Sequence, residues 1–380
     1  MNQNLKKILL VFGTRPEAIK MAPLVEPLSK NFNVIICVTA QHRGMLDQVL
    51  EIFKLRPDFD LDLMKSDQTL FSLTSEIIAK TKLIYDQIQP DIVLVHGDTT
   101  TAFAASLSSF YSRIPIGHIE AGLRTNNIQS PFPEEANRQL ISRLANYHFA
   151  PTINAQNNLI AEGVKSEQIF ITGNTVIDAI LSVQNESFAQ DYPKELIQRM
   201  PFLENVNNQR DLRIILVTGH RRENFGKGFS EICKALEMLA LSNPSIEIIY
   251  PVHLNPNVKI PVTKMLSHIK NIHLIEPLAY VMFVKLMQDS YIILTDSGGI
   301  QEEAPSLGKP VLVMRNTSER PEAIEAGTAI LVGSRASEIE SRTQEILNSD
   351  ELYLSMSKAH NPYGDGKSSE IIAQKLFEVL

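Results

Sequence analysis

Short apolar runs of strand length alternate with longer amphipathic stretches along almost all of the 380 residues. This alternation is typical of parallel βαβ units, whose strands are buried on both faces beneath covering helices. We therefore predict an α/β fold. The predicted strands of the first half are Ile8–Phe12, Val34–Thr39, Ile92–His96, Ile114–Ile119 and Tyr147–Ala150, with a weaker edge strand at Phe59–Met64 and helices such as Met45–Phe53 and Leu73–Ile88 between them. Those of the second half are Ile214–Thr218, Ile246–Val252, Ile272–Ile275, Ile292–Thr295, Val311–Met314 and Ile330–Val332.

The length predicts two domains, because one hydrophobic core rarely holds so many residues. We place the first domain at residues 1–172 and the second at 173–365, each a Rossmann-like doubly wound sheet, with a polar stretch around 185–208 between the two series of strands. A final helix at about 366–380 is expected to pack back on the first domain. Open parallel sheets bind ligands outside the carboxyl ends of their strands, so the active site is expected in the cleft between the domains.

Composition excludes several classes of protein. Apolar residues make up 44% and charged residues 21% of the chain, which fits a soluble enzyme. A formal net charge of -7 argues against nucleic acid as a partner. No segment has membrane-spanning length and the amino terminus lacks a signal-peptide core, so we expect no membrane insertion and a cytoplasmic location. Cys37 and Cys233 lie in apolar contexts, and no His or Cys spacing predicts a metal site.

Two glycines, Gly298 and Gly299, follow the predicted strand that ends at Thr295 and precede a helix-like stretch. Free N–H groups at a helix start attract anions, and glycines let a phosphate approach them. Glu303, one helical turn further on, could accept hydrogen bonds from ribose hydroxyls. An ordinary glycine-rich turn is the alternative for this segment taken alone.

A second turn of this kind follows the first predicted strand. Gly13 permits a sharp turn, Pro16 suits a first helical position, and Arg15 and Lys20 are cations near the strand end. The turn lacks both G-x-G-x-x-G and G-K-[ST], so neither hydride chemistry nor ATP hydrolysis is indicated. Alone it could be structural, but the two turns together indicate one anionic ligand held from both halves of the molecule.

Three carboxylates, Asp98, Glu120 and Glu134, fall where strands of the first domain should end. Acids that converge at a cleft suit general acid and base catalysis. Asp98 could instead cap the helix that begins near Thr99, and Glu134 could be a helix-start acid that favours the dipole. Glu120 is harder to explain structurally, because it directly follows a buried strand.

Several histidines are further candidates. His220 ends a predicted strand beside Arg221 and Arg222, a combination that suits a leaving diphosphate. His253 is a weaker candidate of the same kind. The remaining three within strand-like runs, His96, His118 and His148, are interpreted as core residues or as supports of the site.

Seven motifs together carry a specific resemblance over nearly the whole chain. They are GTRPEAIK (13–20), HGDTT (96–100), HIEAGLR (118–124), PEEANR (133–138), TGHRRE (218–223), SGGIQEE (297–303) and HNPYGDG (360–366). In this order they resemble the bacterial non-hydrolysing UDP-N-acetylglucosamine 2-epimerases.

The resemblance implies a glycosyltransferase-B-like fold, a homodimer and no cofactor. It implies interconversion of UDP-GlcNAc and UDP-ManNAc by anti elimination of UDP through 2-acetamidoglucal, which supplies ManNAc units for surface polysaccharides. On the matching positions, the acid and base candidates are Asp98, Glu120 and Glu134, with no face of the sugar assigned to each. Diphosphate and sugar contacts would come from Arg15, Lys20, Arg138 and His220, and nucleotide contacts from Phe283, Ser297, Gly298, Gly299, Glu303 and Arg320.

Some members of this family bind a second UDP-GlcNAc as an activator. The implicated positions match at Gln41, Glu134, Arg221 and His253, whereas Gly44 and Asp67 replace a Gln and an Arg. A further departure, Leu278-Ala279, replaces a Gln-containing pair near uracil. Because two donors are lost, we expect allosteric activation to be reduced or altered.

The alternatives are a hydrolysing epimerase that releases ManNAc and UDP, a UDP-sugar glycosyltransferase on the same fold, and a non-catalytic UDP-sugar sensor. Three acids beside one nucleotide site count against the sensor.

Overall fold

The computed structural model describes residues 5–40, 43–64, 68–184, 191–208, 212–219, 221, 224–318 and 320–380. The chain divides into two compact units. Unit 1 comprises Met1–Ala179 with Tyr363–Leu380, and unit 2 comprises Ile180–Pro362. The chain therefore passes between the units within helix α8 (Thr175–Gln184) and again just before Tyr363. The domain boundaries predicted from the sequence were 172/173 and 365/366.

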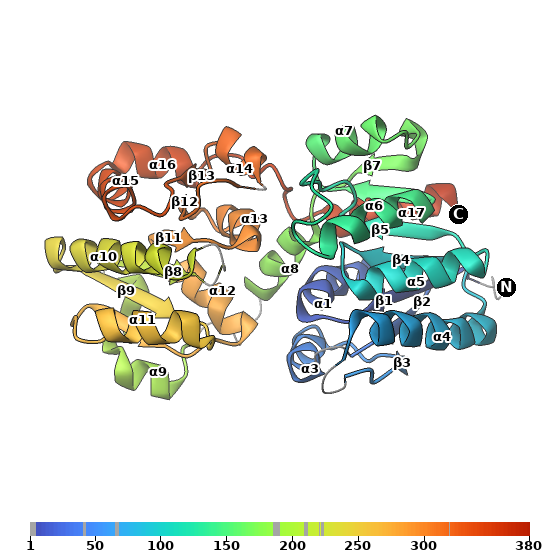
Figure 1. Cartoon of the computed structure of the whole chain (residues 1–380), viewed down its shortest axis with the longest axis horizontal. Helices are drawn as coiled ribbons and strands as arrows, with labels where there is room; N and C mark the ends of the chain where they lie inside the picture. The colour runs from blue at the N-terminus through green and yellow to red at the C-terminus, as the bar shows by residue number, and fades with distance from the viewer. Residues whose placement is uncertain are drawn as a thin grey trace. The chain divides into compact units, whose positions relative to one another are not determined.

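Unit 1 is built around a parallel sheet of seven strands among the described residues, in the order β3-β2-β1-β4-β5-β6-β7 (Figure 1). The strands are β1 (Lys7–Phe12), β2 (Asn33–Val38), β3 (Phe59–Asp60), β4 (Ile92–His96), β5 (Ile116–Ile119), β6 (Tyr147–Ala150) and β7 (Ile169–Ile171). The helices that accompany them are α1 (Arg15–Met21), η1 (Ala22–Leu24), α2 (Val25–Ser29), α3 (Arg43–Ile52), α4 (Leu70–Ile88), α5 (Thr100–Tyr111), α6 (Glu134–Leu144), α7 (Ile153–Ala161), η2 (Ser166–Gln168), α8 and α17 (Ser368–Val379). The central strands are apolar on both faces, which confirms the doubly wound prediction.

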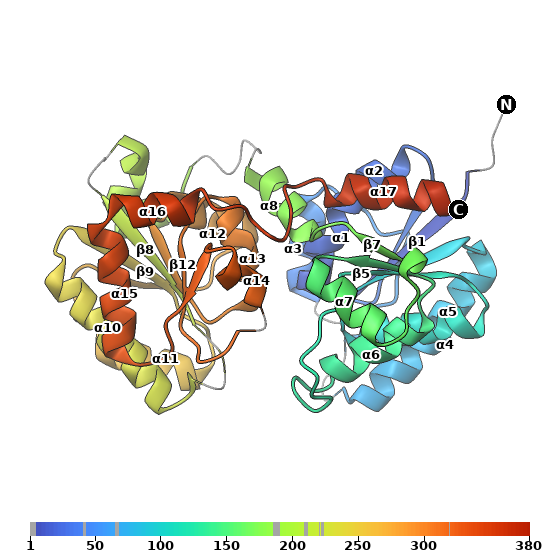
Figure 2. The same cartoon turned by 90° about the horizontal axis from the view of Figure 1, so that it is seen from above.

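The C-terminal helix α17 belongs to unit 1 and lies beside α2, as Figure 2 shows. Phe377 of α17 contacts Phe32 edge-on, with ring centroids 6.4 Å apart. The start of α17 is held by Asp178 of α8, whose carboxylate accepts hydrogen bonds from the backbone N–H groups of Ser368 and Ser369 at 3.3 and 2.7 Å. Free N–H groups at a helix start are stabilised in this way by an acceptor from elsewhere in the chain.

Two predicted strands of unit 1 are longer than the observed ones. The predicted edge strand Phe59–Met64 is only Phe59–Asp60, because Asp62 has a left-handed backbone with φ 44° that interrupts the regular ladder. The N–H groups of Leu61 and Leu63 still donate to the carbonyls of Val38 and Thr39 at 2.9 and 3.0 Å. The strand predicted from Ile114 begins at Ile116. The N–H of Ile114 is already donated to the carbonyl of Ser109, and Pro115 has no N–H to give to a neighbouring strand.

Within its described residues, unit 2 has a second parallel sheet, of six strands in the order β10-β9-β8-β11-β12-β13. Its strands are β8 (Arg213–Thr218), β9 (Ile246–Pro251), β10 (Ile272–Ile275), β11 (Ile292–Thr295), β12 (Val311–Val313) and β13 (Ala329–Leu331). Its helices are α9 (Lys194–Arg199), η4 (Pro201–Asn208), α10 (Lys227–Ser242), α11 (Pro256–Leu266), α12 (Tyr280–Asp289), α13 (Gly298–Ser306), α14 (Pro321–Glu325), α15 (Ala336–Asn348) and α16 (Asp350–Ser357). Helices α9 and η4 lie in the stretch that the sequence marked only as polar.

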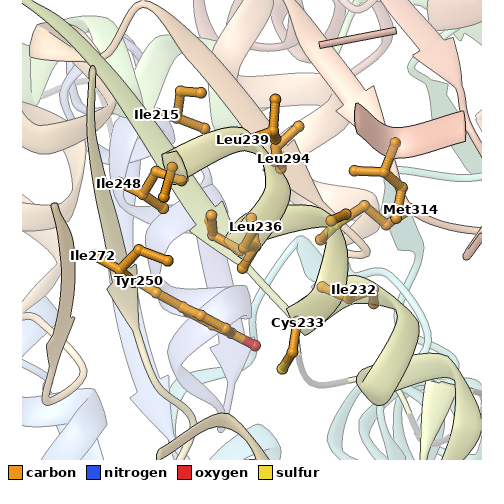
Figure 3. Packing of buried hydrophobic residues seen from close by; sticks show 14 of the residues in the cluster. Ile215, Ile232, Cys233, Leu236, Leu239, Ile248, Tyr250, Ile272, Leu294 and Met314 are labelled. Atoms are coloured by element: carbon orange, nitrogen blue, oxygen red, sulfur yellow. The ribbon is translucent and has the colours of Figure 1, made fainter. Parts of the chain in front are cut away.

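The core of unit 2 forms where α10 packs on the sheet (Figure 3). Ile232, Leu236 and Leu239 recur at helical spacing on the buried face of α10 and are each 0% exposed. They face strand residues such as Ile215 and Ile248. Burial of this apolar face of α10 against the sheet stabilises the sheet. The candidate site residues of unit 2 follow the ends of its strands.

No helix in the described ranges combines the length and the apolar character needed to cross a bilayer. Cys37 and Cys233 are both buried and lie in different units. Burial raises the pKa of each thiol to about 12, so both are small apolar core residues.

Candidate active site

Unit 1 gathers its polar residues at the carboxyl ends of β1, β4, β5 and β7. Strands β4 and β5 are adjacent, and Gly97 after β4 donates its N–H to the carbonyl of Ile119 at 2.9 Å. Asp98 and Glu120, which directly follow these two strands, therefore start from neighbouring positions at one edge of the sheet.

Glu120 lies in a strained and well-anchored position. Its backbone has a φ of 62°, a left-handed conformation that is uncommon for a residue other than glycine. Its carboxylate pairs with the ammonium of Lys20 from α1 and accepts a hydrogen bond from Asn174 Nδ2 at 2.8 Å. His96 Nε2, at the end of β4, lies 3.5 Å from the same oxygen, Oε2. The side chain of Glu120 is only 9% exposed.

Asp98 is paired with Arg138 and does not cap a helix. Arg138 of α6 places its NH2 2.6 Å from Asp98 Oδ2, and Asn137 Nδ2 donates to the Asp98 carbonyl at 2.8 Å. The cap of α5 is Thr99, whose hydroxyl accepts from the N–H of Ala102 at 3.0 Å. The capping alternative for Asp98 is therefore wrong, and α6 is joined to the end of β4 through two consecutive residues.

Glu134 and Glu135 begin α6, and the structure gives them different surroundings. Glu134 is the first residue of the helix, is half-buried, and its carboxylate has no hydrogen-bond or ion-pair partner among the described residues. Glu135 is 0% exposed and accepts from the N–H of Thr125 at 3.1 Å, from Gln139 at 3.1 Å and from Arg138 at 3.1 Å. Burial opposes the charge, but these donors outweigh it and lower the pKa of Glu135.

Glu17 locks the turn that carries Arg15 onto the turn that carries Asp98. Its Oε2 accepts from the N–H groups of Gly13 and Thr14 at 3.0 and 2.8 Å, and its Oε1 accepts from the Thr99 hydroxyl at 2.6 Å. Glu17 is 1% exposed, and burial raises its pKa in spite of these donors. Glu17 and Asn137 lie inside the motifs and Asn174 lies outside them, and none of the three was predicted as a site residue. Each has a partner that is remote along the chain, namely Thr99, Asp98 and Glu120.

In unit 2 the helix α13 begins where the two glycines predicted it. Ser297 is the residue before its first turn, and its N–H donates to the Thr295 hydroxyl at 2.9 Å. A Cβ added to Gly299 would lie 3.2 Å from Glu303 Oε1, so the Glu303 carboxylate reaches back toward the helix start. A helix start with free N–H groups can bind an anion such as phosphate.

Asp296, which directly follows β11, holds the turn after β8 by hydrogen bonds. It is 0% exposed and accepts from the backbone N–H of Arg221 at 2.9 Å and from Asn224 Nδ2 at 3.2 Å. The turn after β8 is thereby tied to the end of β11, the neighbouring strand. His220, Gln41 and Asp67 lie outside the described residues.

The remaining predicted residues of unit 2 lie on different elements. Arg320 forms an ion pair with Glu302, which is 1% exposed, and Ser318 links Arg320 to Gln301 by hydrogen bonds of 3.0 and 2.6 Å. Phe283 is half-buried on α12. His253 is exposed after β9. Among the described residues no group of His, Cys, Asp or Glu side chains is arranged to hold a metal ion.

The comparisons with known proteins agree on one family. The family model for UDP-N-acetylglucosamine 2-epimerase matches residues 27–377. The UDP-N-acetylglucosamine 2-epimerase of Salmonella typhimurium is 56% identical over 97% of this chain and 98% of its own length, and that of Escherichia coli K12 is 55% identical over the same shares.

Solved structures give the same result. The crystal structure of the Neisseria meningitidis UDP-GlcNAc 2-epimerase bound to UDP-GlcNAc superposes with a TM-score of 0.89 at 50% identity, covering 98% of this chain and all of that one. The Methanocaldococcus jannaschii UDP-GlcNAc 2-epimerase in complex with UDP-GlcNAc and UDP gives 0.79 at 33% identity, covering 98% of this chain and 99% of that one. These matches confirm the predicted glycosyltransferase-B-like fold. The chain belongs to the UDP-N-acetylglucosamine 2-epimerase family.

Proposed function

We propose that this enzyme epimerises UDP-GlcNAc and UDP-ManNAc reversibly at C2 by eliminating and re-adding UDP. A base removes the C2 proton, the bond electrons form the C1–C2 double bond of 2-acetamidoglucal, and the C1–O bond breaks to release UDP. Re-addition of UDP with a proton delivered to the opposite face gives the epimer. No redox cofactor enters this balance. By family resemblance the product supplies ManNAc units for surface polysaccharides.

The observation that carries the proposal is the pairing of two acids with two cations at adjacent strand ends of unit 1. Asp98 pairs with Arg138 and Glu120 with Lys20. The C2 hydrogen is not next to a carbonyl, so its removal needs a positioned base together with stabilisation of the departing diphosphate. Inversion at C2 needs proton access from two faces, for which Asp98, Glu120 and Glu134 are the candidates.

The nucleotide is proposed to bind at α13. Backbone N–H groups of Gly298 and Gly299 and the Ser297 cap would hold phosphate, and Glu303 would accept from ribose hydroxyls. Arg320 and Phe283 would contact the remainder of the nucleotide, and Arg15, Lys20 and His220 would neutralise the diphosphate. The proposed substrate contacts are thus divided between the two units.

Incubation with UDP-GlcNAc in deuterated water without an acceptor tests the function. Recovery of UDP-ManNAc with deuterium at C2 supports the epimerase. Accumulation of free ManNAc and UDP would identify a hydrolysing enzyme, turnover only with added acceptor a glycosyltransferase, and binding without exchange a sensor. The variant Asp98→Asn should lose exchange by at least about 100-fold, whereas Asp86→Asn, a surface change on α4, should exchange normally.

We also propose that the chain works as a homodimer through an apolar face of unit 1. Helices α4, α5 and α6 lie side by side (Figure 1) and expose large side chains, among them Leu83 at 68%, Phe110 at 54% and Tyr111 at 68%. Phe110 and Tyr111 also line a hollow of about 600 Å³. Such an exposed patch is typical of an association surface.

Light scattering tests the homodimer. The wild type should have twice the mass of one chain, and Tyr111→Glu should have the mass of one chain. Leu241→Glu, in unit 2, is the control and should leave the dimer intact.

We propose that activation by a second UDP-GlcNAc is reduced here, because Gly44 and Asp67 replace a Gln and an Arg at the implicated positions, although Gln41, Arg221 and His253 match. A hyperbolic rate curve with UDP-ManNAc supports this, and a strongly sigmoidal one contradicts it. The proposed cytoplasmic location can be checked by cell fractionation.

A further inference from the structure

His96 has a buried ring nitrogen whose environment calls for an explanation. It is the last residue of β4 and is 4% exposed, and its Nε2 is buried with no hydrogen-bond partner in the described part of the chain. Native proteins rarely leave a buried polar atom in this state. The Glu120 carboxylate lies close to this nitrogen, with Oε2 3.5 Å from Nε2, just beyond the usual hydrogen-bond distance.

Three side-chain nitrogens from three segments converge on that oxygen of Glu120. Lys20 comes from α1, His96 from the end of β4, and Asn174 from the turn after β7. Asn174 is itself rigidly held, since it is 2% exposed, its N–H donates to the Tyr363 carbonyl at 2.7 Å and its Oδ1 accepts from the N–H of Val176 at 3.1 Å.

The other two buried histidines of this sheet show that His96 is different. His118 donates from Nε2 to the Gly97 carbonyl at 2.7 Å, and burial lowers its pKa to about 3. His148 lies on the next strand, β6, and burial lowers its pKa to about 4. Both are neutral core residues at ordinary pH, and no ion pair with a carboxylate is recorded for either among the described residues. His96 differs because its ring points a nitrogen at a carboxylate of the candidate site.

We propose that His96 is a positioning residue whose Nε2–H donates to Glu120 Oε2 during the reaction, opposite Asn174. This inference rests on the proposed acid or base role of Glu120. A carboxylate that transfers a proton to carbon must hold one orientation, because small misplacement of reacting atoms is costly. A nearby cation such as Lys20 favours the charged carboxylate and weakens it as a base. When Lys20 turns to the substrate diphosphate, His96 and Asn174 keep the Glu120 carboxylate in place.

Substitution of His96 tests the proposal, with His148 as the matched control. His96→Leu should lower kcat by about 10- to 100-fold, the effect of losing one hydrogen bond to a charged group, and should leave KM nearly unchanged. The acidic limb of the kcat profile should move to higher pH, because the carboxylate loses a donor that favours its charged form. His148→Leu, an equal change on β6, should stay within about twofold of wild type. Equal effects of the two substitutions would overturn the proposal.

A second pair of variants keeps the test independent of folding defects. The amide of His96→Gln reaches about as far as Nε2 and should restore most of kcat, whereas the shorter His96→Asn should not. In a Glu120→Gln background, His96→Leu should cause little further loss, because coupled residues are not additive. Independent, multiplicative losses would show that His96 does not act through Glu120.

A spectroscopic readout separates this inference from the proposed reaction. Nitrogen NMR of His96, identified by its loss in His96→Gln, should show the Nε2–H tautomer and a shift on Glu120→Ala. A ring protonated only at Nδ1 would overturn the inference even in an active enzyme. An inactive wild type with the expected signals would instead contradict the proposed function and leave the His96–Glu120 bond established.

Discussion

The guanidinium of Arg138 lies 2.6 Å from the carboxylate of Asp98 and joins helix α6 to the end of β4. The same guanidinium contacts Glu135 at 3.1 Å. Burial opposes the charge on Arg138, but the two carboxylates outweigh it and raise the pKa of the guanidinium further. Arg138 is thus a permanent cation held beside an acid candidate, which suits it to stabilise negative charge during elimination.

Arg138→Met should lower kcat by at least about 100-fold, because Asp98 loses its cation and the departing diphosphate loses a positive charge. The fold should survive, since Glu135 keeps hydrogen bonds from Thr125 and Gln139. Steady-state kinetics and circular dichroism check both statements. Arg143→Met, at an exposed position of the same helix, is the control. Full activity of Arg138→Met would contradict this role.

The adjacency of the acids could be predicted from the sequence, but their partners could not. Apolar runs ending in Gly97-Asp98 and in Glu120 read as parallel strands, and parallel strands share one edge for all their carboxyl ends. That argument brings Asp98 and Glu120 together without any coordinate. It does not show that Arg138 and Asn137 from α6 contact Asp98, since the position of a helix over the sheet depends on tertiary packing.

Local backbone geometry explains where the predicted end of a strand and the predicted cap of a helix were wrong. The pattern Phe59–Met64 alternates like a strand, yet the left-handed backbone of Asp62 interrupts the regular ladder. At Asp98, preference alone favoured a helix cap, but Thr99 one residue later has the geometry to accept from Ala102. The sequence shows that both Asp98 and Thr99 could cap α5. Which of them does so depends on the turn that Gly97 permits, with a φ of 64°.

Gly13→Ala should destabilise unit 1 and weaken catalysis. An added Cβ would lie 2.0 Å from the Thr39 hydroxyl and 2.6 Å from that of Thr101, so the turn that carries Arg15 must shift. We expect a loss of about 1–3 kcal/mol in the free energy of unfolding, measured by denaturant titration, together with a higher KM. Gly44→Ala is the control, because a Cβ there would meet nothing within 4 Å in helix α3. It should be neutral or slightly stabilising, and equal losses for both variants would contradict the packing argument.

Asp178→Ala should loosen helix α17. The Asp178 carboxylate accepts from Ser368 and Ser369 at the start of that helix, and loss of a capping acceptor costs about 1–2 kcal/mol. Hydrogen exchange should increase in the first turn of α17 and remain unchanged in the core strands. Glu370→Ala removes an exposed carboxylate from the same turn and should have a much smaller effect. Uniform protection in Asp178→Ala would show that apolar packing alone holds α17.

Glu17→Gln should change how stability depends on pH. Burial raises the pKa of Glu17 above 4.5 in spite of hydrogen bonds from Thr99, Gly13 and Thr14. A carboxyl group whose pKa is higher in the folded than in the unfolded chain contributes stability below the unfolded value, and this contribution is lost as pH rises through the folded value. Glutamine has no such proton, and it nearly preserves the volume of the side chain.

The melting temperature of wild type relative to Glu17→Gln should therefore fall as pH is raised from about 4.5 to about 8. All other titrating groups are common to both proteins and cancel in this difference. Glu26→Gln, at an exposed position of α2, should show a flat difference over the same range. If wild type instead gains on Glu17→Gln as pH rises, the three donors dominate over burial, and the turn that carries Arg15 is held by an ionised carboxylate.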